Sequence, residues 1–116
     1  TNCYDPMFDY IEMCVSASFR DTDTYFATLA HELAHSTGAN GRLNRIKTSA
    51  RFGSQSYAVE ELVAEIGSAN LMNIIGIETK KSFRNSTAYI QSWLRVLRND
   101  NKFIVSASSK AEKAVE

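Results

Sequence analysis

The sequence predicts an α+β domain that is mainly α, with about four helices and a small β element at its N-terminus. Apolar residues recur at helical spacing in four stretches of the chain. A strand-like run precedes these stretches and follows the only proline. The chain has 116 residues, of which 44% are apolar, and this is enough for one hydrophobic core. Residues 1–116 are therefore expected to form a single domain.

The first two elements are expected to be a strand and a helix. Residues 7–15 alternate imperfectly between apolar and polar side chains, which favours a strand with Pro6 at its entry. Residues 20–23 offer several side-chain oxygens that can cap the start of a helix. The apolar spacing that follows predicts a helix over 22–37, and Gly38 is expected to end it in a left-handed conformation.

A loop and a second helix are expected next. Residues 39–54 hold glycines, asparagines and hydroxyl side chains without a sustained period, and this composition is typical of a loop. A loop of that length inside a small domain is more often functional than incidental. The apolar spacing from Ser56 to Ile75 predicts the second helix, which Gly76 is expected to stop.

Two further helices are expected in the C-terminal third of the chain. Asn85 or Ser86 can cap the first of them, because both side chains accept a backbone N–H well. Asn99 or Asp100 can cap the second, which is expected to run toward Val115.

Charge and hydropathy disfavour several function classes. Thirteen basic and thirteen acidic side chains give zero net charge, so attraction of the whole domain to nucleic acid or to an anionic membrane is not expected. No run approaches eighteen consecutive apolar residues, which argues against a membrane-spanning helix. Cys3 and Cys14 do not make a disulfide framework, and we expect reduced thiols in a cytoplasmic protein.

The helix expected over 22–37 contains an H-E-x-x-H motif, with the only two histidines of the chain at His31 and His35. Four residues at 100° each place the two imidazoles within about 40° of each other and one turn apart, so both can reach one metal ion. This spacing predicts a tetrahedral site for one Zn²⁺ ion. Glu32 lies about 100° around the helix and is expected to accept a proton from a water that the metal activates.

The third ligand is expected to be a carboxylate, because no histidine remains. Gly41 stands where the longer metzincin motif has its third histidine, which excludes that class. Glu61 and Glu65 share one face of the second helix. We predict Glu61 as the third ligand and Glu65 as the acceptor of the free ring N–H of a ligating histidine. The reverse assignment remains open, as does an acidic stripe in solvent, and Glu60 is expected to face solvent.

Basic side chains gather between the two helices that carry these residues. From Leu33 to Val59 the chain has no aspartate or glutamate. Arg42 and Arg45 in this stretch are candidates for contacts with a carboxylate or phosphate of a substrate. A solvated basic loop is the alternative, because surface loops carry charge for solubility alone.

Several runs of the sequence together resemble the zincin-like metallopeptidase domain of ArdC-type antirestriction proteins, which plasmids and other mobile elements carry. The runs are YFATLAHELAHSTG at 25–38, RLNR at 42–45, FGS at 52–54, YA at 57–58, EELVAE at 60–65, AYI at 88–90 and WL at 93–94. The chain is more distantly similar to gluzincins, whose third ligand is a glutamate on a following helix. Ser36 departs from the pattern, because the family often has an aromatic residue there.

The resemblance implies a metal held by His31, His35 and a glutamate of the 60–65 run, and a role in protecting incoming DNA from host restriction. In that family the domain follows another that binds single-stranded DNA. Residues 1–116 are therefore expected to be the C-terminal domain of a longer protein, with DNA contacts made through the preceding domain.

Two functions are compatible with these observations. The first is a zinc-dependent metallopeptidase that cleaves a protein or peptide with Glu32 as general base. The second is a non-catalytic antirestriction module whose metal orders the fold and which binds DNA or a host protein. The intact Glu32 favours the peptidase, because a purely structural metal site has no use for a base.

Overall fold

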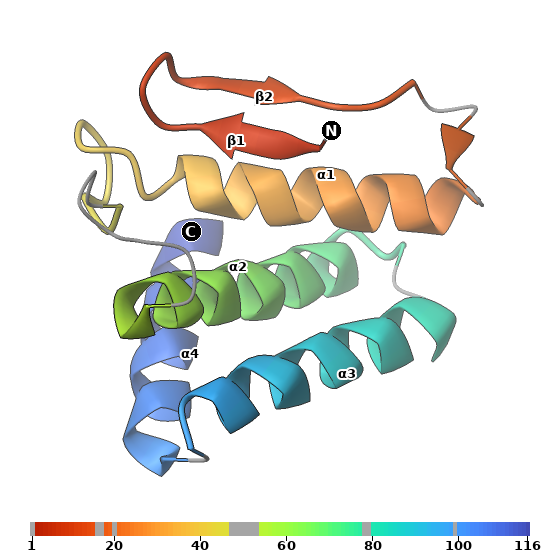
Figure 1. Ribbon diagram of the computed structural model, residues 1–116. Helices are drawn as coiled ribbons and strands as arrows, with labels where there is room; N and C mark the ends of the chain where they lie inside the picture. Colours follow the sequence, from red (N-terminus) through yellow and green to blue (C-terminus); the bar gives the residue numbers. More distant parts are fainter. Residues whose placement is uncertain (1, 16–17, 20, 47–53, 78–79, 99) are drawn as a thin grey trace.

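The computed structural model describes residues 2–15, 18–19, 21–46, 54–77, 80–98 and 100–116. A β-hairpin covers one side of α1, α2 packs against the other side, and α3 lies beyond α2, while α4 runs across these helices (Figure 1). The fold class predicted from the sequence, α+β and mainly α, is confirmed. The elements are β1 (Cys3–Asp5), β2 (Tyr10–Glu12), α1 (Thr22–Ser36), α2 (Gln55–Ile74), α3 (Lys80–Val96) and α4 (Asn101–Val115).

The N-terminal β element is a short antiparallel hairpin of β1 and β2. Oδ1 of Asp5 accepts the backbone N–H groups of Met7 and Phe8 at 2.9 and 3.1 Å, and this side-chain turn reverses the chain. The strand expected over 7–15 is therefore confirmed only at Tyr10–Glu12, and the rest of that range is not a strand. Met7 and Phe8 belong to the turn, where their side chains are exposed, and the apparent alternation of the run comes from these turn residues.

The helix expected over 22–37 is confirmed as α1. The Asp21 carboxylate caps it by accepting a backbone N–H of the first turn at 2.7 Å. Gly38, however, lacks the positive φ that was expected, and Thr37 ends the helix in a right-handed conformation. A Cβ at Gly38 would lie 3.0 Å from Nη2 of Arg45, so the close approach of this side chain explains the glycine.

The helix expected over 56–75 is confirmed as α2. Ser54 caps its start by accepting the N–H of Tyr57 at 3.1 Å. Gly76 follows its end with a φ of 79°, the left-handed conformation that glycine adopts most readily. Of the loop expected over 39–54, residues 39–46 hold no helix or strand, and 47–53 lie outside the described residues.

The third helix begins earlier than predicted, whereas the fourth is confirmed. Asn85 and Ser86, expected as caps, lie inside α3, because the residues from Lys80 onward include no helix breaker that would delay its start. Asp100 caps α4 by accepting a backbone N–H at 3.1 Å. Within the ranges that the structure describes, no helix is long and apolar enough to cross a membrane.

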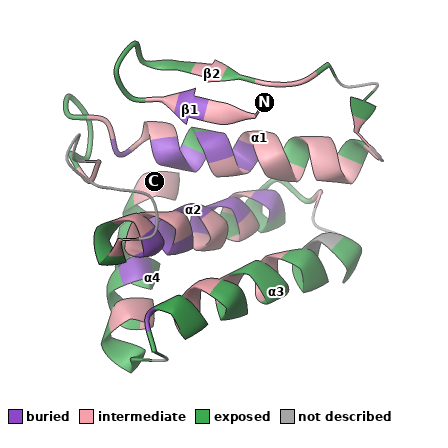
Figure 2. Ribbon diagram, viewed as in Figure 1, coloured by how far each residue is buried: buried purple, intermediate pink, exposed green. Residues whose placement is uncertain are grey.

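The hydrophobic core surrounds α2, which contacts the other three helices. Buried residues gather where α2 meets α1 and α4, while much of α3 is exposed (Figure 2). A Cβ at Gly67 would lie 3.4 Å from the Cβ of Ala34, so α1 and α2 approach closely at that point. This approach brings the acidic first turns of α2 against the histidines of α1. The core residues are Ala58, Leu62, Val63, Leu97, Ala107 and Ala111.

Candidate metal centre

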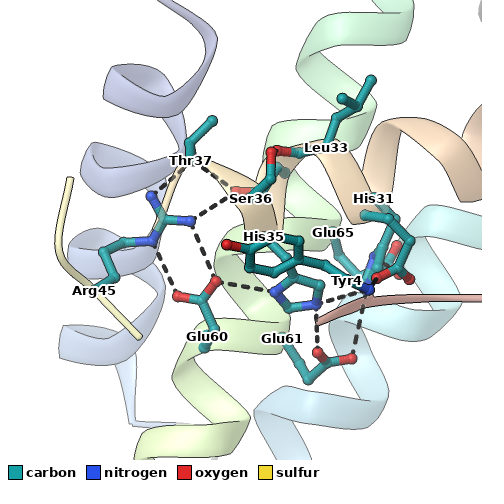
Figure 3. Close-up of polar contacts among 12 residues, drawn as sticks. Tyr4, His31, Leu33, His35, Ser36, Thr37, Arg45, Glu60, Glu61 and Glu65 are labelled. Atoms are coloured by element: carbon teal, nitrogen blue, oxygen red, sulfur yellow. Dashed lines mark hydrogen bonds and ion pairs between the residues drawn. The ribbon is translucent and has the colours of Figure 1, made fainter. Parts of the chain in front are cut away.

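The two histidines of α1 point their Nε2 atoms at the same place. These atoms lie 3.1 Å apart, as expected for imidazoles one helical turn from each other (Figure 3). Glu61 approaches from α2, with Oε2 2.6 Å from Nε2 of His35 and Oε1 3.5 Å from Nε2 of His31. The ligand atoms that His31, His35 and Glu61 offer all lie within 4.8 Å of one another, so the three residues could hold one metal ion.

The spacing of these atoms fits a divalent ion. In a tetrahedral site with bonds of about 2.0 to 2.2 Å, two ligand atoms lie roughly 3.3 Å apart. The 3.1 Å between the two Nε2 atoms and the 3.5 Å between Nε2 of His31 and Oε1 of Glu61 lie near this value, whereas Oε2 of Glu61 lies closer to Nε2 of His35, at 2.6 Å. Two imidazole nitrogens and a carboxylate oxygen also form a donor set that zinc and similar ions prefer. The residues present therefore fit one divalent metal ion.

Glu60 lies against the outer nitrogen of His35 and does not face solvent. Its Oε2 accepts a hydrogen bond from Nδ1 of His35 at 2.9 Å. A metal-binding histidine commonly donates its other ring N–H to a carboxylate in this way, which fixes the ring orientation. The expectation that Glu60 is solvated is wrong. Helix α1 packs over a wide part of the α2 surface, which includes Glu60 as well as the face that Glu61 and Glu65 share. The spacing of Glu61 and Glu65 gives no sign of this role for Glu60, because Glu60 lies on a different face of the helix.

Glu65 occupies the corresponding place beside His31. Its Oε1 lies 2.8 Å from Nδ1 of His31. The two groups are close enough for an ion pair. The N–H bond at Nδ1 of His31 does not point at the Glu65 oxygen, however, so the contact is not an aligned hydrogen bond. The structure thus brings Glu61 to the two Nε2 atoms and Glu65 to an outer ring nitrogen, which is the arrangement expected when Glu61 is the ligand.

The two arginines after α1 contact protein groups. Arg45 donates to both carboxylate oxygens of Glu60, at 3.0 and 3.2 Å. Arg42 forms an ion pair with Asp9 in the hairpin turn and donates from Nε to the carbonyl of Ser36 at 2.7 Å. The side chain of Arg42 is 45% exposed and that of Arg45 only 8%. Their contacts with a substrate stay a prediction.

The carboxylates of the site stabilise the positively charged forms of His31 and His35. Burial lowers the pKa of His31, but Glu61 and Glu65 outweigh this effect and raise the pKa to about 10. Burial works against ionisation of His35 too, and its contacts with Glu60 and Glu61 still raise its pKa. Burial raises the pKa of Glu61, while His31 and His35 lower it to about 2. A cation among these groups is therefore strongly stabilised, whether it is an imidazolium or a metal ion.

Glu32 stands beside the three potential ligands without joining them. It is buried, and its Oε1 accepts the backbone N–H of Tyr4 in β1 at 2.8 Å. Its carboxylate lines the same cavity as His31 and His35. Among the described residues, the group that could bind a metal does not include it. The hairpin thus fixes one oxygen of a carboxylate that borders the cavity.

Two cavities meet at this cluster. One, of about 700 Å³, is lined by residues of β1, α1, α2 and α4, including Glu32 and Tyr57. The other, of about 760 Å³, lies among α1, α2 and α3 and has mainly polar side chains. His31 and Glu61 border both cavities, so the site can be reached from two sides. The polar lining of the second cavity includes Thr24, Thr28, Ser68, Lys81, Asn85 and Ser92.

The site thus has two histidines one turn apart on a helix, a glutamate from a second helix and a further glutamate that is not among the potential ligands. This arrangement defines a zincin-type centre. The sequence matches the model of the zincin-like metallopeptidase family over residues 1–110, and the chain belongs to that family.

Solved structures that it resembles include two of the antirestriction protein ArdC from plasmid R388. The chain is 43% identical to the Mn(II)-bound structure with a TM-score of 0.77, and the match covers 99% of this chain and 42% of the ArdC chain. With the metal-free structure the identity is 42% and the TM-score 0.71, and the match covers 99% of this chain and 40% of the ArdC chain.

Two curated relatives are similar over almost the whole chain. The protein y4eC of Sinorhizobium fredii is 39% identical over 113 residues, which are 97% of this chain and 36% of y4eC. A DNA primase TraC of Escherichia coli is 40% identical over 110 residues, 95% of this chain and 10% of the primase. The chain therefore spans less than half the length of each of these proteins.

Proposed function

We propose that this chain is a zinc-dependent metallopeptidase domain of an antirestriction protein, with His31, His35 and Glu61 as ligands and Glu32 as general base. One observation carries the proposal: the three ligand atoms converge within 4.8 Å while the Glu32 carboxylate lines the same cavity and is held apart from them. A site built only to stabilise the fold needs a closed set of ligands and no neighbouring base.

A divalent ion bound there supplies Lewis acidity, which lowers the pKa of water and polarises a peptide carbonyl. Glu32 accepts the proton of the attacking water and passes it to the leaving amine. Because Oε1 of Glu32 is engaged by the N–H of Tyr4, Oε2 is the oxygen assigned to this proton transfer. Glu65 and Glu60 keep the two imidazoles turned so that both Nε2 atoms face the ion.

The choice of zinc follows from the donor set of two imidazoles and one carboxylate. The similar ArdC structure contains Mn(II), so we propose that this chain accepts manganese as well. We further propose a cytoplasmic protein in which this domain follows a DNA-binding domain, as the resemblance to ArdC-type proteins implies.

The test is a Glu32→Gln substitution. The amide keeps the size and the hydrogen bond from Tyr4 but cannot accept the proton, so zinc content and fold should be retained while hydrolysis of an unfolded protein such as casein falls by about 10²-fold or more. Glu112→Gln, an exposed site on α4 outside both cavities, is the matched control and should keep full hydrolysis. Loss of turnover in both variants, or in neither, would contradict the assignment.

The alternative is a non-catalytic antirestriction module that binds DNA or a host protein. It is favoured by the occurrence of similar sequence in a DNA primase, a protein that acts on nucleic acid. The zero net charge of the chain argues against direct DNA binding by this domain. Restriction protection in cells separates the two functions: it should fall with Glu32→Gln if proteolysis is the mechanism, and full protection by a zinc-loaded Glu32→Gln protein would establish the alternative.

A further inference from the structure

Arg45 is a buried guanidinium in an otherwise exposed loop. Its side chain is 8% exposed, whereas the residues from Asn40 to Asn44 are all exposed. It donates to protein groups from all three nitrogens. Nε donates to Oε1 of Glu60 at 3.0 Å, Nη2 to Oε2 of Glu60 at 3.2 Å and to the carbonyl of Ala34 at 2.8 Å, and Nη1 to Oγ1 of Thr37 at 2.9 Å.

These contacts make a two-point pair with Glu60 that is anchored on the C-terminal turn of α1. A planar guanidinium that binds both oxygens of a carboxylate fixes its position and its plane, which a lysine cannot do. Gly38 provides the room, because a Cβ there would lie 3.0 Å from Nη2 of Arg45. The loop and the helix end are thus shaped around one guanidinium.

The same carboxylate continues to the metal centre. Oε2 of Glu60 also accepts from Nδ1 of His35 at 2.9 Å. An imidazole that donates its Nδ1–H keeps the lone pair of Nε2, and Nε2 of His35 is the atom that faces Glu61 and His31. Arg45, Glu60 and His35 therefore form a continuous chain that ends at a proposed metal ligand (Figure 3).

Charge explains why the arginine is needed. Glu60, Glu61 and Glu65 all turn toward two histidines, and Glu60 is itself largely buried. Without a cation behind it, an ionised Glu60 would gain stability by turning away to water, and His35 would lose the acceptor of its Nδ1–H. Arg45 holds both oxygens of Glu60 at 3.0 and 3.2 Å and so keeps this carboxylate beside Nδ1 of His35.

We propose that Arg45 is a positioning residue of the metal centre: through Glu60 it fixes the ring orientation and the protonated nitrogen of His35, so that metal affinity depends on a loop residue that touches no ligand. This inference rests on the proposed metal site. A carboxylate behind a ligating histidine is typically worth 10 to 100-fold in metal affinity, and removal of the arginine behind it is expected to cost about 10-fold.

The test is a double-mutant cycle on metal affinity. Zn²⁺ binding by the 116-residue chain is titrated against a chromophoric chelator in wild type, Arg45→Gln, Glu60→Gln and the double variant. Arg45→Gln should weaken binding about 10-fold when Glu60 is present and less than about 2-fold when residue 60 is glutamine, because the effect passes through that carboxylate. Arg95→Gln, an exposed arginine of α3, is the matched control and should keep wild-type affinity.

An equal weakening by Arg45→Gln in both backgrounds would overturn the inference, because a general loss of stability does not depend on Glu60. Unchanged affinity in Arg45→Gln would overturn it as well. If Arg45→Gln does not fold, Gly38→Ala replaces it in the same cycle: it keeps every charge and displaces the guanidinium, and the same outcomes apply. Failure of the wild type to bind zinc through His31 and His35 would instead refute the proposed function.

Discussion

His31 and His35 occupy equivalent places on α1, yet their outer nitrogens meet different surroundings. Nδ1 of His35 donates to Glu60, which Arg45 holds at two points. Nδ1 of His31 lies 2.8 Å from Glu65, for which the described residues supply no second partner. His31 also borders both cavities, whereas His35 borders one. His35 is therefore fixed by a buried ionic network, whereas His31 has fewer supporting groups and lies on the side that borders both cavities.

The difference shows how a small domain can position the residues of such a site with only a few supporting groups. The half of the site around His35, the fixed half, combines the end of α1, the loop after it and Glu60 in the second turn of α2. The half around His31, the adjustable half, uses Glu65 in the third turn of α2. We expect the fixed half to set the affinity for the ion and the adjustable half to tolerate changes in coordination during a reaction.

The largest effect is expected from Glu61, because its oxygens contact both histidines. Glu61→Ala should lower zinc affinity by more than about 100-fold, beyond the range typical of residues that only support a ligand. Competition with a chelator measures the change, and Glu12→Ala on the exposed hairpin is a control that should bind normally. A larger loss in Glu65→Ala than in Glu61→Ala would transfer the ligand role to Glu65.

The next effect sharpens the comparison between the halves. Glu60→Ala and Glu65→Ala remove equivalent carboxylates, but Glu60 belongs to the anchored network. We expect a loss of zinc affinity near 100-fold for Glu60→Ala and near 10-fold for Glu65→Ala. The same titration decides the point, and equal losses or a reversed order would show that anchoring by Arg45 does not distinguish the two histidines.

The pKa values predict how stability without metal depends on pH. His31 has its pKa raised to about 10, so its contribution is fully present below the unfolded value of about 6.5 and is lost as the pH rises through 10. Glu61 has its pKa lowered to about 2, so its contribution is present above about 4.5 and is lost as the pH falls toward 2.

Urea unfolding in EDTA across pH 3 to 10 measures this dependence. The expected profile is a plateau between about pH 5 and 6 with a decline on both sides, and His31→Gln should reduce the decline above it to the part that His35 contributes. A wild-type profile that rises steadily from pH 6 to 10 would show that His31 is neutral in the folded chain and would remove the charge argument for the site.

The smallest effect is expected from Arg42, the exposed counterpart of Arg45. Its ion pair with Asp9 lies in solvent, so Arg42→Ala should leave the free energy of unfolding nearly unchanged. Urea unfolding with zinc present measures this. A large loss of stability would mean that the hairpin depends on this contact, and a raised KM for peptide at unchanged stability would support a contact between Arg42 and substrate.

The sequence predicts α1, α2 and α4 well because each combines apolar residues at helical spacing with an acidic or hydroxyl cap. The sequence also predicts that His31, His35 and Glu61 meet. The two histidines are four residues apart on one helix, and Glu61 lies on the helix that packs beside it. Their metal binding stays a prediction.

Other features depend on tertiary packing and are not visible in a single element. Glu60 lies 100° from Glu61 on α2, and only the packing of α1 shows that both face the histidines. From the sequence alone Arg45 is one basic residue of a loop. Only the structure shows that Gly38 makes room for its guanidinium. The Asp5 side-chain turn could have been inferred from Asp-Pro, which is typical of turns.

The most direct test of the account is a metal analysis combined with anomalous scattering at the zinc edge on crystals of the chain. The account predicts about one equivalent of Zn²⁺ and one anomalous peak within about 2.0 to 2.2 Å of Nε2 of His31, Nε2 of His35 and a carboxylate oxygen of Glu61. A chain that stays free of metal after reconstitution with zinc, or a peak away from these two histidines, would contradict it.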